Sequence, residues 1–240
     1  MQAVILAGGL GTRLKTVIND RPKPMAPVLD KPFLEYQINY LKKYDVREVV
    51  LCVGYMWEKI RDHFKDGKER GIRIHYAVEE TPLGTGGALK NAEEFIHTPF
   101  LMLNGDSFFN LNIKDLRNFH EQAKSGKEHF LGTIALTRVA DRSQYGTVLL
   151  GAGAAIAAFK EKSAGENVSG LINAGIYLLE PDIFMRIPPR QKLSLEREIF
   201  PPLLAKGFSL AGYPAEGFFV DIGTPEGFHT FKQYAKEEHL

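Results

Sequence analysis

The sequence is poor in the features that cross-link a chain or anchor it in a membrane. Its 240 residues include one cysteine, Cys52, so an internal disulfide is excluded and a reducing compartment fits. Cys52 lies in the apolar run Val49–Val53, where a free cysteine is expected to be a small buried residue. No apolar run reaches the roughly 20 residues that span a bilayer, and the first residues lack the basic start of a signal peptide. We expect a soluble cytoplasmic protein that does not bind membranes.

An excess of charge of one sign is also missing. The 30 basic and 29 acidic residues leave a formal net charge of +1, which argues against a broad nucleic-acid-binding surface. The seven histidines show no zinc-ligand spacing. An apolar content of 44% and a charged content of 25% are ordinary for a globular protein. The length suits one sizeable domain, residues 1–240, with halves that meet near residue 110.

The first half alternates between strand and helix patterns. The strand-like segments are Ala3–Ala7, Val46–Val53, Ile72–Val78 and Phe100–Asn104, and the helix-like segments are Pro32–Tyr44, Trp57–Phe64 and Gly86–Ile96. Such alternation is typical of βαβ units. It predicts an α/β, Rossmann-like fold with a mostly parallel central sheet flanked by helices.

The second half is richer in strands. The expected strands are Leu131–Thr137, Thr147–Leu150, Ala155–Lys160, Leu171–Leu179 and Phe218–Asp221. The segment 151–158 favours a turn followed by an edge strand. A helical pattern covers Leu195–Ala205, although Pro201-Pro202 must kink or end that helix. Thr224-Pro225-Glu226 has the residue types that begin a helix.

A glycine-rich turn, Gly8-Gly9-Leu10-Gly11-Thr12-Arg13, directly follows the first strand. Its glycines let the backbone approach an anion, and successive N–H groups in such a turn bind phosphate oxygens. Arg13 adds a planar guanidinium suited to phosphate. The turn is not a P-loop, because Thr12-Arg13 stands where Lys-Ser/Thr is required. It is not a dinucleotide fingerprint either, because Leu14 replaces the third glycine. A plain tight turn is the alternative.

A lysine between two prolines, Pro22-Lys23-Pro24, follows this turn. Proline fixes its own φ and pushes the preceding residue towards extended geometry. We therefore expect an extended backbone at Lys23 that aims its amine in one direction. A rigid surface loop with an exposed lysine is the alternative.

Together, the segments Gly8–Leu14 and Pro22–Pro24 resemble the signature of the sugar-phosphate nucleotidyltransferase family. This resemblance implies a glycosyltransferase-A-like fold and a reaction that joins a nucleoside monophosphate to a sugar 1-phosphate and releases pyrophosphate. It assigns catalytic contacts with the reacting phosphates to Arg13 and Lys23. The residues expected to bind the nucleotide at this strand end and loop are Leu6, Ala7, Gly8, Gly9, Gly11 and Thr12.

Two aspartates, Asp106 and Asp221, each follow a strand. Magnesium prefers oxygen ligands and is usually bound by one or two carboxylates together with substrate phosphates. The aspartates are far apart in sequence, so spacing alone does not pair them, and each could instead form a turn. Both match the metal-binding aspartates of the family, which implies Mg²⁺ as the cofactor. The Asp-x-Asp motif of related glycosyltransferases is absent, because Phe108 occupies its second position.

The resemblance also implies contacts with the base and the sugar. It assigns binding of the base to Gly84 and Thr85. The alternative for Thr85 is that its side chain caps a helix. Lys162 is expected to bind the sugar phosphate. The residues expected to contact the sugar are Asn104, Gly105, Glu161 and Asn173. Many family members have proline after Glu-Lys, whereas this chain has Ser163, and Glu161-Lys162 alone would read as a solvated ion pair.

The base cannot be chosen from these residues by physical argument alone. The resemblance covers most of the chain and is strongest to family members that use GTP and D-glycero-α-D-manno-heptose 1-phosphate. It is carried by Lys15–Arg21, Pro82–Ala88, Asn104–Phe109 and Leu171–Leu179. Mannose 1-phosphate, or UTP or dTTP with another sugar, are the alternatives within the family. A catalytically silent regulatory protein is an alternative from another class, against which the retained set Arg13, Lys23, Asp106, Lys162 and Asp221 argues. Assembly into a homo-oligomer is left open.

Overall fold

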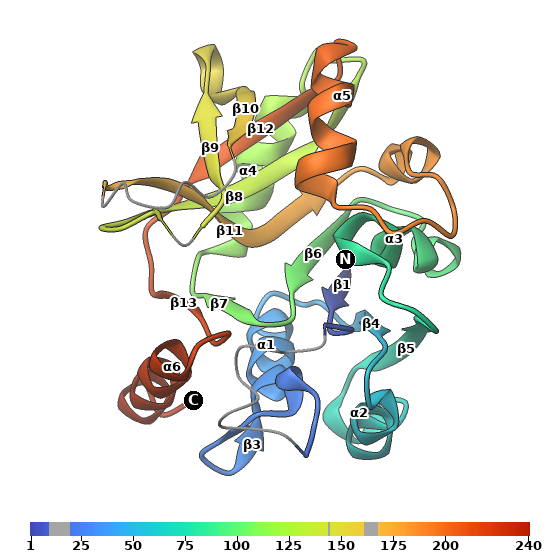
Figure 1. Ribbon diagram of the computed structural model, residues 1–240, viewed down its shortest axis with the longest axis vertical. Coiled ribbons are helices and arrows are strands. Elements are labelled where there is room, and N and C mark those ends of the chain that lie inside the picture. Colours follow the sequence, from blue (N-terminus) through green and yellow to red (C-terminus); the bar gives the residue numbers. More distant parts are fainter. Residues whose placement is uncertain (10–19, 144, 161–167) are drawn as a thin grey trace.

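Four adjacent parallel strands form one side of the main sheet (Figure 1). The computed structural model describes residues 1–9, 20–143, 145–160 and 168–240. The four strands, in spatial order, are β6 (Phe100–Asn104), β1 (Gln2–Leu6), β4 (Glu48–Val53) and β5 (Arg73–Val78). The interior residues of β1, β4 and β6 are buried, as expected for parallel strands covered on both faces. Their carboxyl ends meet at one edge, where ligands bind in open α/β sheets.

Hydrophobic cores fill both faces of this sheet. Successive residues of β1 alternate between them, because Ala3 and Ile5 belong to one core and Val4 to the other. The helices that contribute to the core of the first face are α1 (Phe33–Lys42), α2 (Trp57–Phe64), α4 (Ile113–Lys124) and α6 (Pro225–Glu237). Those of the second face are α3 (Gly84–Asn91) and α5 (Phe200–Ala205). The expected α/β class with a helix-flanked sheet is confirmed.

The second half extends the sheet mainly with antiparallel strands. These strands are β8 (Phe130–Val139), β9 (Thr147–Leu150), β10 (Ile156–Lys160), β11 (Gly170–Leu179) and β12 (Ser209–Pro214). Strand β11 joins the halves, because it pairs antiparallel with β6 and with β8. Only β12 runs parallel to its neighbour, β8, among the strands described in this half. The expected edge strand is confirmed as β10, which follows a short turn at Ala152–Ala154.

The elements that were not expected from the sequence include β7 (Ser107–Phe109), at the end of the first half, and α4 (Ile113–Lys124) and β12 in the second half. Helix α4 is capped by Asn112, whose side chain accepts a hydrogen bond from the Lys114 N–H at 3.0 Å. It buries only Ile113, Leu116 and His120. So few buried positions on a polar helix give a weak periodic signal.

The Leu195–Ala205 segment differs from the expectation in one respect. Residues Leu195–Ile199 form a π-helical turn, and α5 begins at Phe200. Pro201 and Pro202 therefore lie in the first turn of α5 and start that helix rather than end it. The first turn tolerates proline because its N–H groups have no partner within the helix.

The chain ends with α6, which packs close to a short β-ribbon. Its cap is Thr224, whose hydroxyl accepts a hydrogen bond from the Gly227 N–H, as expected. The ribbon consists of β7 and the antiparallel β13 (Phe219–Asp221). A second ribbon is formed by β2 (Pro27–Val28) and β3 (Lys31–Pro32).

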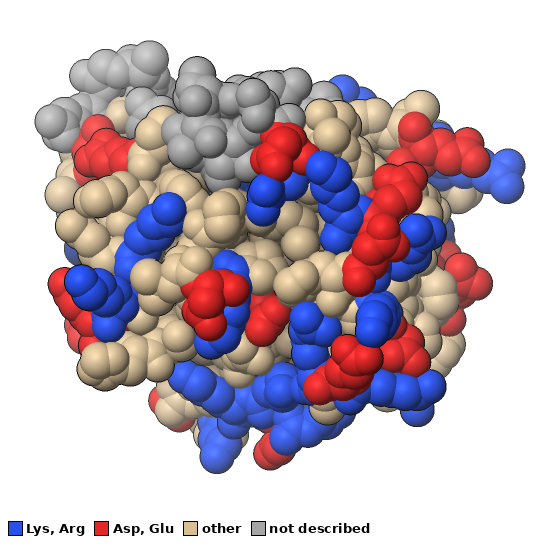
Figure 2. Space-filling view, turned by 90° about the horizontal axis from the view of Figure 1, so that it is seen from below, with Lys and Arg blue, Asp and Glu red and all other residues tan. Residues whose placement is uncertain are grey.

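Two further sequence expectations concern burial and charge. Cys52 is fully buried and donates a hydrogen bond to the Ala88 carbonyl, and burial raises the pKa of its thiol. On the face drawn in Figure 2, basic and acidic side chains lie interspersed. In the parts of the chain that the structure describes, no helix has both the length and the apolar character needed to cross a bilayer.

Candidate active site

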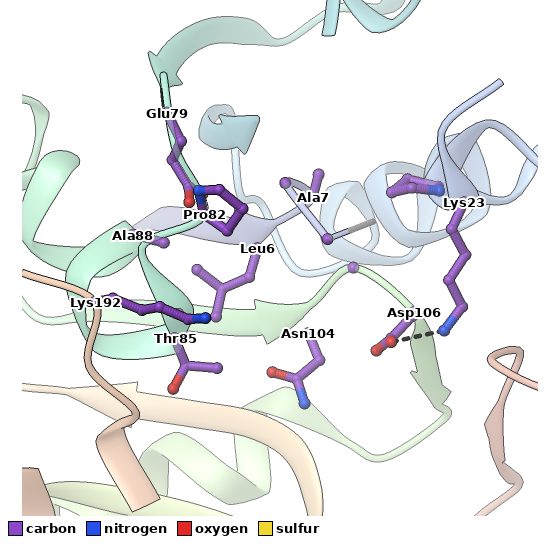
Figure 3. Close-up of a pocket in the computed structure, with 15 residues that line it drawn as sticks. Leu6, Ala7, Lys23, Glu79, Pro82, Thr85, Ala88, Asn104, Asp106 and Lys192 are labelled. Carbon is purple, nitrogen blue, oxygen red and sulfur yellow. Dashed lines mark hydrogen bonds and ion pairs between the residues drawn. The ribbon is translucent and has the colours of Figure 1, made fainter. Parts of the chain in front are cut away.

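A cavity of about 400 Å³ opens at the carboxyl ends of the parallel strands. The expected residues that line it are Leu6, Ala7, Gly8, Gly9, Lys23, Gly84, Thr85, Asn104, Gly105 and Asp106. Figure 3 shows an elongated arrangement, with Glu79, Pro82 and Lys192 at one end and Lys23 and Asp106 at the other. The cavity thus has two chemically different ends joined along β1 and β6.

The two central strands approach each other closely at the cavity floor. The Gly105 N–H donates a hydrogen bond to the Leu6 carbonyl at 3.0 Å. A Cβ at residue 105 would lie 2.5 Å from that carbonyl oxygen, which is shorter than any van der Waals contact. Glycine at 105 is therefore required for the turn that presents Asp106.

Two carboxylates and one ammonium group meet at the end of the cavity that contains Lys23 and Asp106. The Lys23 Nζ atom lies 2.8 Å from Asp106 Oδ2 and 3.7 Å from Asp221 Oδ1. The side chain of Lys23 is only 9% exposed, whereas that of Asp106 is 39% exposed, so the carboxylate remains open to the cavity. The structure thus brings together three residues that the sequence separates widely.

The β7–β13 ribbon explains why the two aspartates meet. Asp221 pairs with Ser107, the residue after Asp106, and the Ile222 N–H donates to the Asp106 carbonyl at 2.9 Å. The extended backbone expected at Lys23 is wrong, because Lys23 begins a 3₁₀-helix that ends at Met25. The extended residue is Pro22, with φ −68° and ψ 149°. Pro22 therefore sets the direction of the chain just before the lysine.

The other end of the cavity contains Glu79, which the sequence analysis did not select. Glu79 Oε2 accepts a hydrogen bond from the Leu83 N–H at 2.9 Å. Burial raises the pKa of this carboxyl above its ordinary value of 4.5, and the Leu83 N–H partly opposes that rise. Its position in the sequence could have indicated Glu79, because it directly follows the strand β5, just as Ala7 directly follows β1.

The expected base-binding segment is held by a loop from the second half of the chain. The Gly86 N–H donates to the Leu193 carbonyl at 2.8 Å, and the Leu193 N–H donates to the Leu83 carbonyl at 2.9 Å. Gly84 has φ +69°, and a Cβ there would lie 2.6 Å from the Leu193 oxygen. This loop also places Lys192 in the cavity wall, a position that no sequence motif marks.

The capping alternative for Thr85 is wrong. Leu83 is the N-cap of α3, so Thr85 lies inside the first turn. Its hydroxyl donates to Glu196 Oε2 at 3.0 Å and accepts from the Leu195 N–H at 2.9 Å. The Thr85 side chain therefore binds the start of the π-helical turn while it lines the cavity.

The two expected sugar-side asparagines lie on neighbouring strands. Asn173, in β11, donates to the Tyr177 hydroxyl at 2.6 Å and accepts from the Gly175 N–H at 2.9 Å. Gly175 has φ +73°, and a Cβ there would lie 2.7 Å from Nδ2 of Asn104. The fold thus places β11, which carries Asn173, against the end of β6 at Asn104.

Five expected site residues lie outside the described part of the chain. These residues are Gly11, Thr12, Arg13, Glu161 and Lys162. Five residues that the sequence analysis did not select also line the cavity: Pro24, Glu79, Pro82, Ala88 and Lys192.

The fold and the site together define an α/β protein with a nucleotide-sized cavity and paired carboxylates at strand ends. The chain belongs to the nucleotidyl transferase family, whose pattern it matches over residues 2–238. This confirms the family prediction made from the two motifs.

The relatives with similar sequences include guanylyltransferases. The chain is 42% identical to the D-glycero-α-D-manno-heptose 1-phosphate guanylyltransferase of Campylobacter jejuni, covering 96% of this chain and 98% of the relative. It is 38% identical to the protein of the same name from Aneurinibacillus thermoaerophilus, with 95% of each chain covered. It is 39% identical to a mannose-1-phosphate guanylyltransferase catalytic subunit beta from Danio rerio, covering 96% of this chain and 63% of the relative.

A solved structure agrees with these matches. HddC from Yersinia pseudotuberculosis, crystallised in complex with GMP-PN, superposes with a TM-score of 0.81 at 31% identity. The match covers 97% of this chain and 98% of HddC.

Proposed function

We propose that the protein transfers GMP from GTP to D-glycero-α-D-manno-heptose 1-phosphate, giving GDP-heptose and pyrophosphate. The observation that carries the proposal is the convergence of Lys23, Asp106 and Asp221 at one end of the cavity. Similarity over nearly the whole chain to two guanylyltransferases with this sugar in their names supports the choice of substrates.

The reaction needs positioning and charge neutralisation more than new chemistry. The sugar phosphate is already a nucleophile, so its oxygen attacks the α-phosphorus in line and pyrophosphate leaves. Lys23 would neutralise the α-phosphate as charge develops there. Arg13 would hold the leaving pyrophosphate and Lys162 the attacking phosphate.

Asp106 and Asp221 would hold a divalent cation, Mg²⁺. The donor set fits this ion, because magnesium takes hard oxygen ligands from one or two carboxylates and from phosphates. The ammonium group of Lys23 already lies against both carboxylates, so the pair stabilises a cation at this point. When bound, such a cation neutralises negative charge on phosphate oxygens.

Glu79 favours guanine at the other end of the cavity. Guanine presents the adjacent donors N1–H and N2–H, which an ionised carboxylate can accept together. Uracil and thymine present one N–H between two carbonyl oxygens, which a carboxylate would repel. One oxygen of Glu79 accepts from the Leu83 N–H, which fixes the carboxyl beside the cavity. We therefore assign base selection to Glu79, with Gly84 and Thr85 in the supporting wall.

Mannose 1-phosphate is the second candidate acceptor, because a mannose-1-phosphate guanylyltransferase is 39% identical to the chain. The two sugars share a manno-configured ring and differ beyond C6. A pocket that tolerates the extra bulk of the heptose would accept both, since small differences in a pocket discriminate only modestly.

Pyrophosphate release measured over a panel of substrates tests the proposal. The panel combines GTP, ATP, UTP, CTP and dTTP with heptose, mannose, glucose and N-acetylated sugar 1-phosphates. We expect the highest kcat/KM with GTP and the heptose 1-phosphate. A preference for UTP or dTTP would contradict the guanylyl assignment, and pyrophosphate release with no pair would point to the silent regulatory class.

A further inference from the structure

Glu196 accepts hydrogen bonds from three hydroxyl groups on three segments of the chain. The Tyr177 hydroxyl donates to Oε1 at 2.7 Å, and the hydroxyls of Thr85 and Ser194 donate to Oε2 at 3.0 Å and 2.8 Å. Tyr177 lies in β11, Thr85 in α3, and Ser194 caps the π-helical turn that carries Glu196. One carboxylate therefore ties together a strand, a helix and a loop.

The network touches the cavity wall at Thr85 and continues behind the wall to β11. On the base side, Thr85 lines the cavity wall. On the sugar side, Asn173 donates to the Tyr177 hydroxyl at 2.6 Å, which orients the tyrosine proton towards Glu196. Glu196, Tyr177 and Asn173 are not among the described residues that line the cavity. Strand β11 pairs with β6, which ends at the cavity-lining Asn104, so the network acts on ligands through Thr85 and through this strand pair.

The donors in this network are well defined. Tyr177 is only 1% exposed, and burial together with the neighbouring Glu196 raises the pKa of its hydroxyl well above the ordinary value. The hydroxyl therefore keeps its proton and remains a donor. Hydrogen bonds to an ionised acceptor are shorter and stronger than neutral ones, so the three contacts hold their segments rigidly. A π-helical turn is an uncommon element that often occurs at functional sites.

We propose that Glu196 is a positioning residue that fixes the base-side helix α3 and the sugar-side strand β11 relative to each other for in-line transfer. The inference rests on the proposed function, since it assigns the two sides of the cavity to the two substrates. Its specific claim is that hydroxyl groups on opposite sides cooperate because they share one carboxylate.

The test uses Tyr177→Phe, Thr85→Val and the double variant, with Glu196→Gln as an independent disruption of the acceptor. Tyr177→Phe should lower kcat about tenfold to a hundredfold, since small misalignments cost this much in a positioned reaction. The KM for either substrate should change less than kcat. The double variant should lose less than the product of the two single losses, because each single change already breaks the shared link.

Tyr40→Phe is the matched control, because Tyr40 is buried and its hydroxyl also bonds elsewhere in the core, to the Leu111 carbonyl at 2.6 Å. It should match Tyr177→Phe in thermal stability while it keeps wild-type kcat. Wild-type kcat in Tyr177→Phe, or multiplicative losses in the double variant, would overturn the proposal. The variants are assayed with whichever substrates the wild-type protein uses best, so a wrong substrate assignment is seen separately in the wild-type panel.

Discussion

The two halves of the molecule build the site in different ways. In the first half, residues such as Gly8, Glu79 and Asp106 lie where parallel strands end. In the second half, Asn173 lies inside β11, whereas Lys192 and Glu196 lie in irregular or π-helical segments. Parallel strands collect their carboxyl ends at one edge, so sequence order alone places those residues together. The antiparallel half has no such rule.

The halves also differ in what their side chains contact. Lys23 and Asp106 bind each other within the cavity. Asn173, Tyr177 and Glu196 bond to one another and hold the wall in place. We therefore expect substitutions of Lys23 or Asp106 to remove charge at the reacting phosphates, and substitutions of Tyr177 or Glu196 to disturb alignment.

The largest effect is expected from loss of either aspartate. Asp106→Ala and Asp221→Ala should fold but lose activity on the order of a thousandfold, because the reacting phosphates lose charge neutralisation. Asp62→Ala is the control, since Asp62 pairs only with the neighbouring Arg61 at an exposed position among the contacts described. Steady-state turnover at saturating Mg²⁺ measures the effect, and wild-type turnover in either variant would remove that residue from the proposed metal site.

A second prediction assigns each substrate to a basic residue in a different half of the chain. Arg13→Ala should mainly weaken use of the triphosphate, and Lys162→Ala should mainly weaken use of the sugar 1-phosphate. Each lost phosphate contact should cost about 2–4 kcal/mol in transition-state stabilisation. Kinetics with each substrate varied in turn would show the division, and identical effects of both variants on both substrates would contradict it.

A third prediction compares two glycines of the first half. Gly105→Ala should reduce the free energy of unfolding by about 1–3 kcal/mol, as overpacking does, because its Cβ would collide with the Leu6 carbonyl. Gly9→Ala should change stability little, since no atom lies within 4 Å of a Cβ there among the described residues. Chemical denaturation of both variants measures the contrast, and equal losses would show that close packing does not explain Gly105.

The smallest effect concerns pH and Glu79. Its pKa in the folded protein is raised above the usual 4.5, so the folded state binds this proton more tightly than the unfolded state. The contribution to stability is therefore present at pH below 4.5 and is lost as pH rises through the raised folded pKa. Glu79→Gln should lack this decline in unfolding titrations. It should also remove the preference for GTP, and an unchanged GTP preference would exclude Glu79 from base selection.

The sequence predicted the parallel half of the fold, and many of the residues it selected line the cavity. Strand β6 and helix α2 begin and end where the pattern indicated, because buried apolar runs and helical spacing are strong local signals. Helix α4 and strand β12 were missed, because few of the residues of α4 are buried and β12 is defined by its partner β8. The contact of Lys23 with both aspartates depends on the β7–β13 ribbon, and such long-range pairing leaves no local pattern.

Transfer of label from GTP tests the central claim most directly. With GTP labelled at the α-phosphate and D-glycero-α-D-manno-heptose 1-phosphate, we expect the label in the nucleotide sugar. With GTP labelled at the γ-phosphate, we expect it in pyrophosphate. Both transfers should disappear in Asp106→Ala. Nucleotidyl transfer at this site would be contradicted if the γ-phosphate were transferred to the sugar. It would also be contradicted if the α-label stayed in GTP when both substrates and Mg²⁺ were saturating.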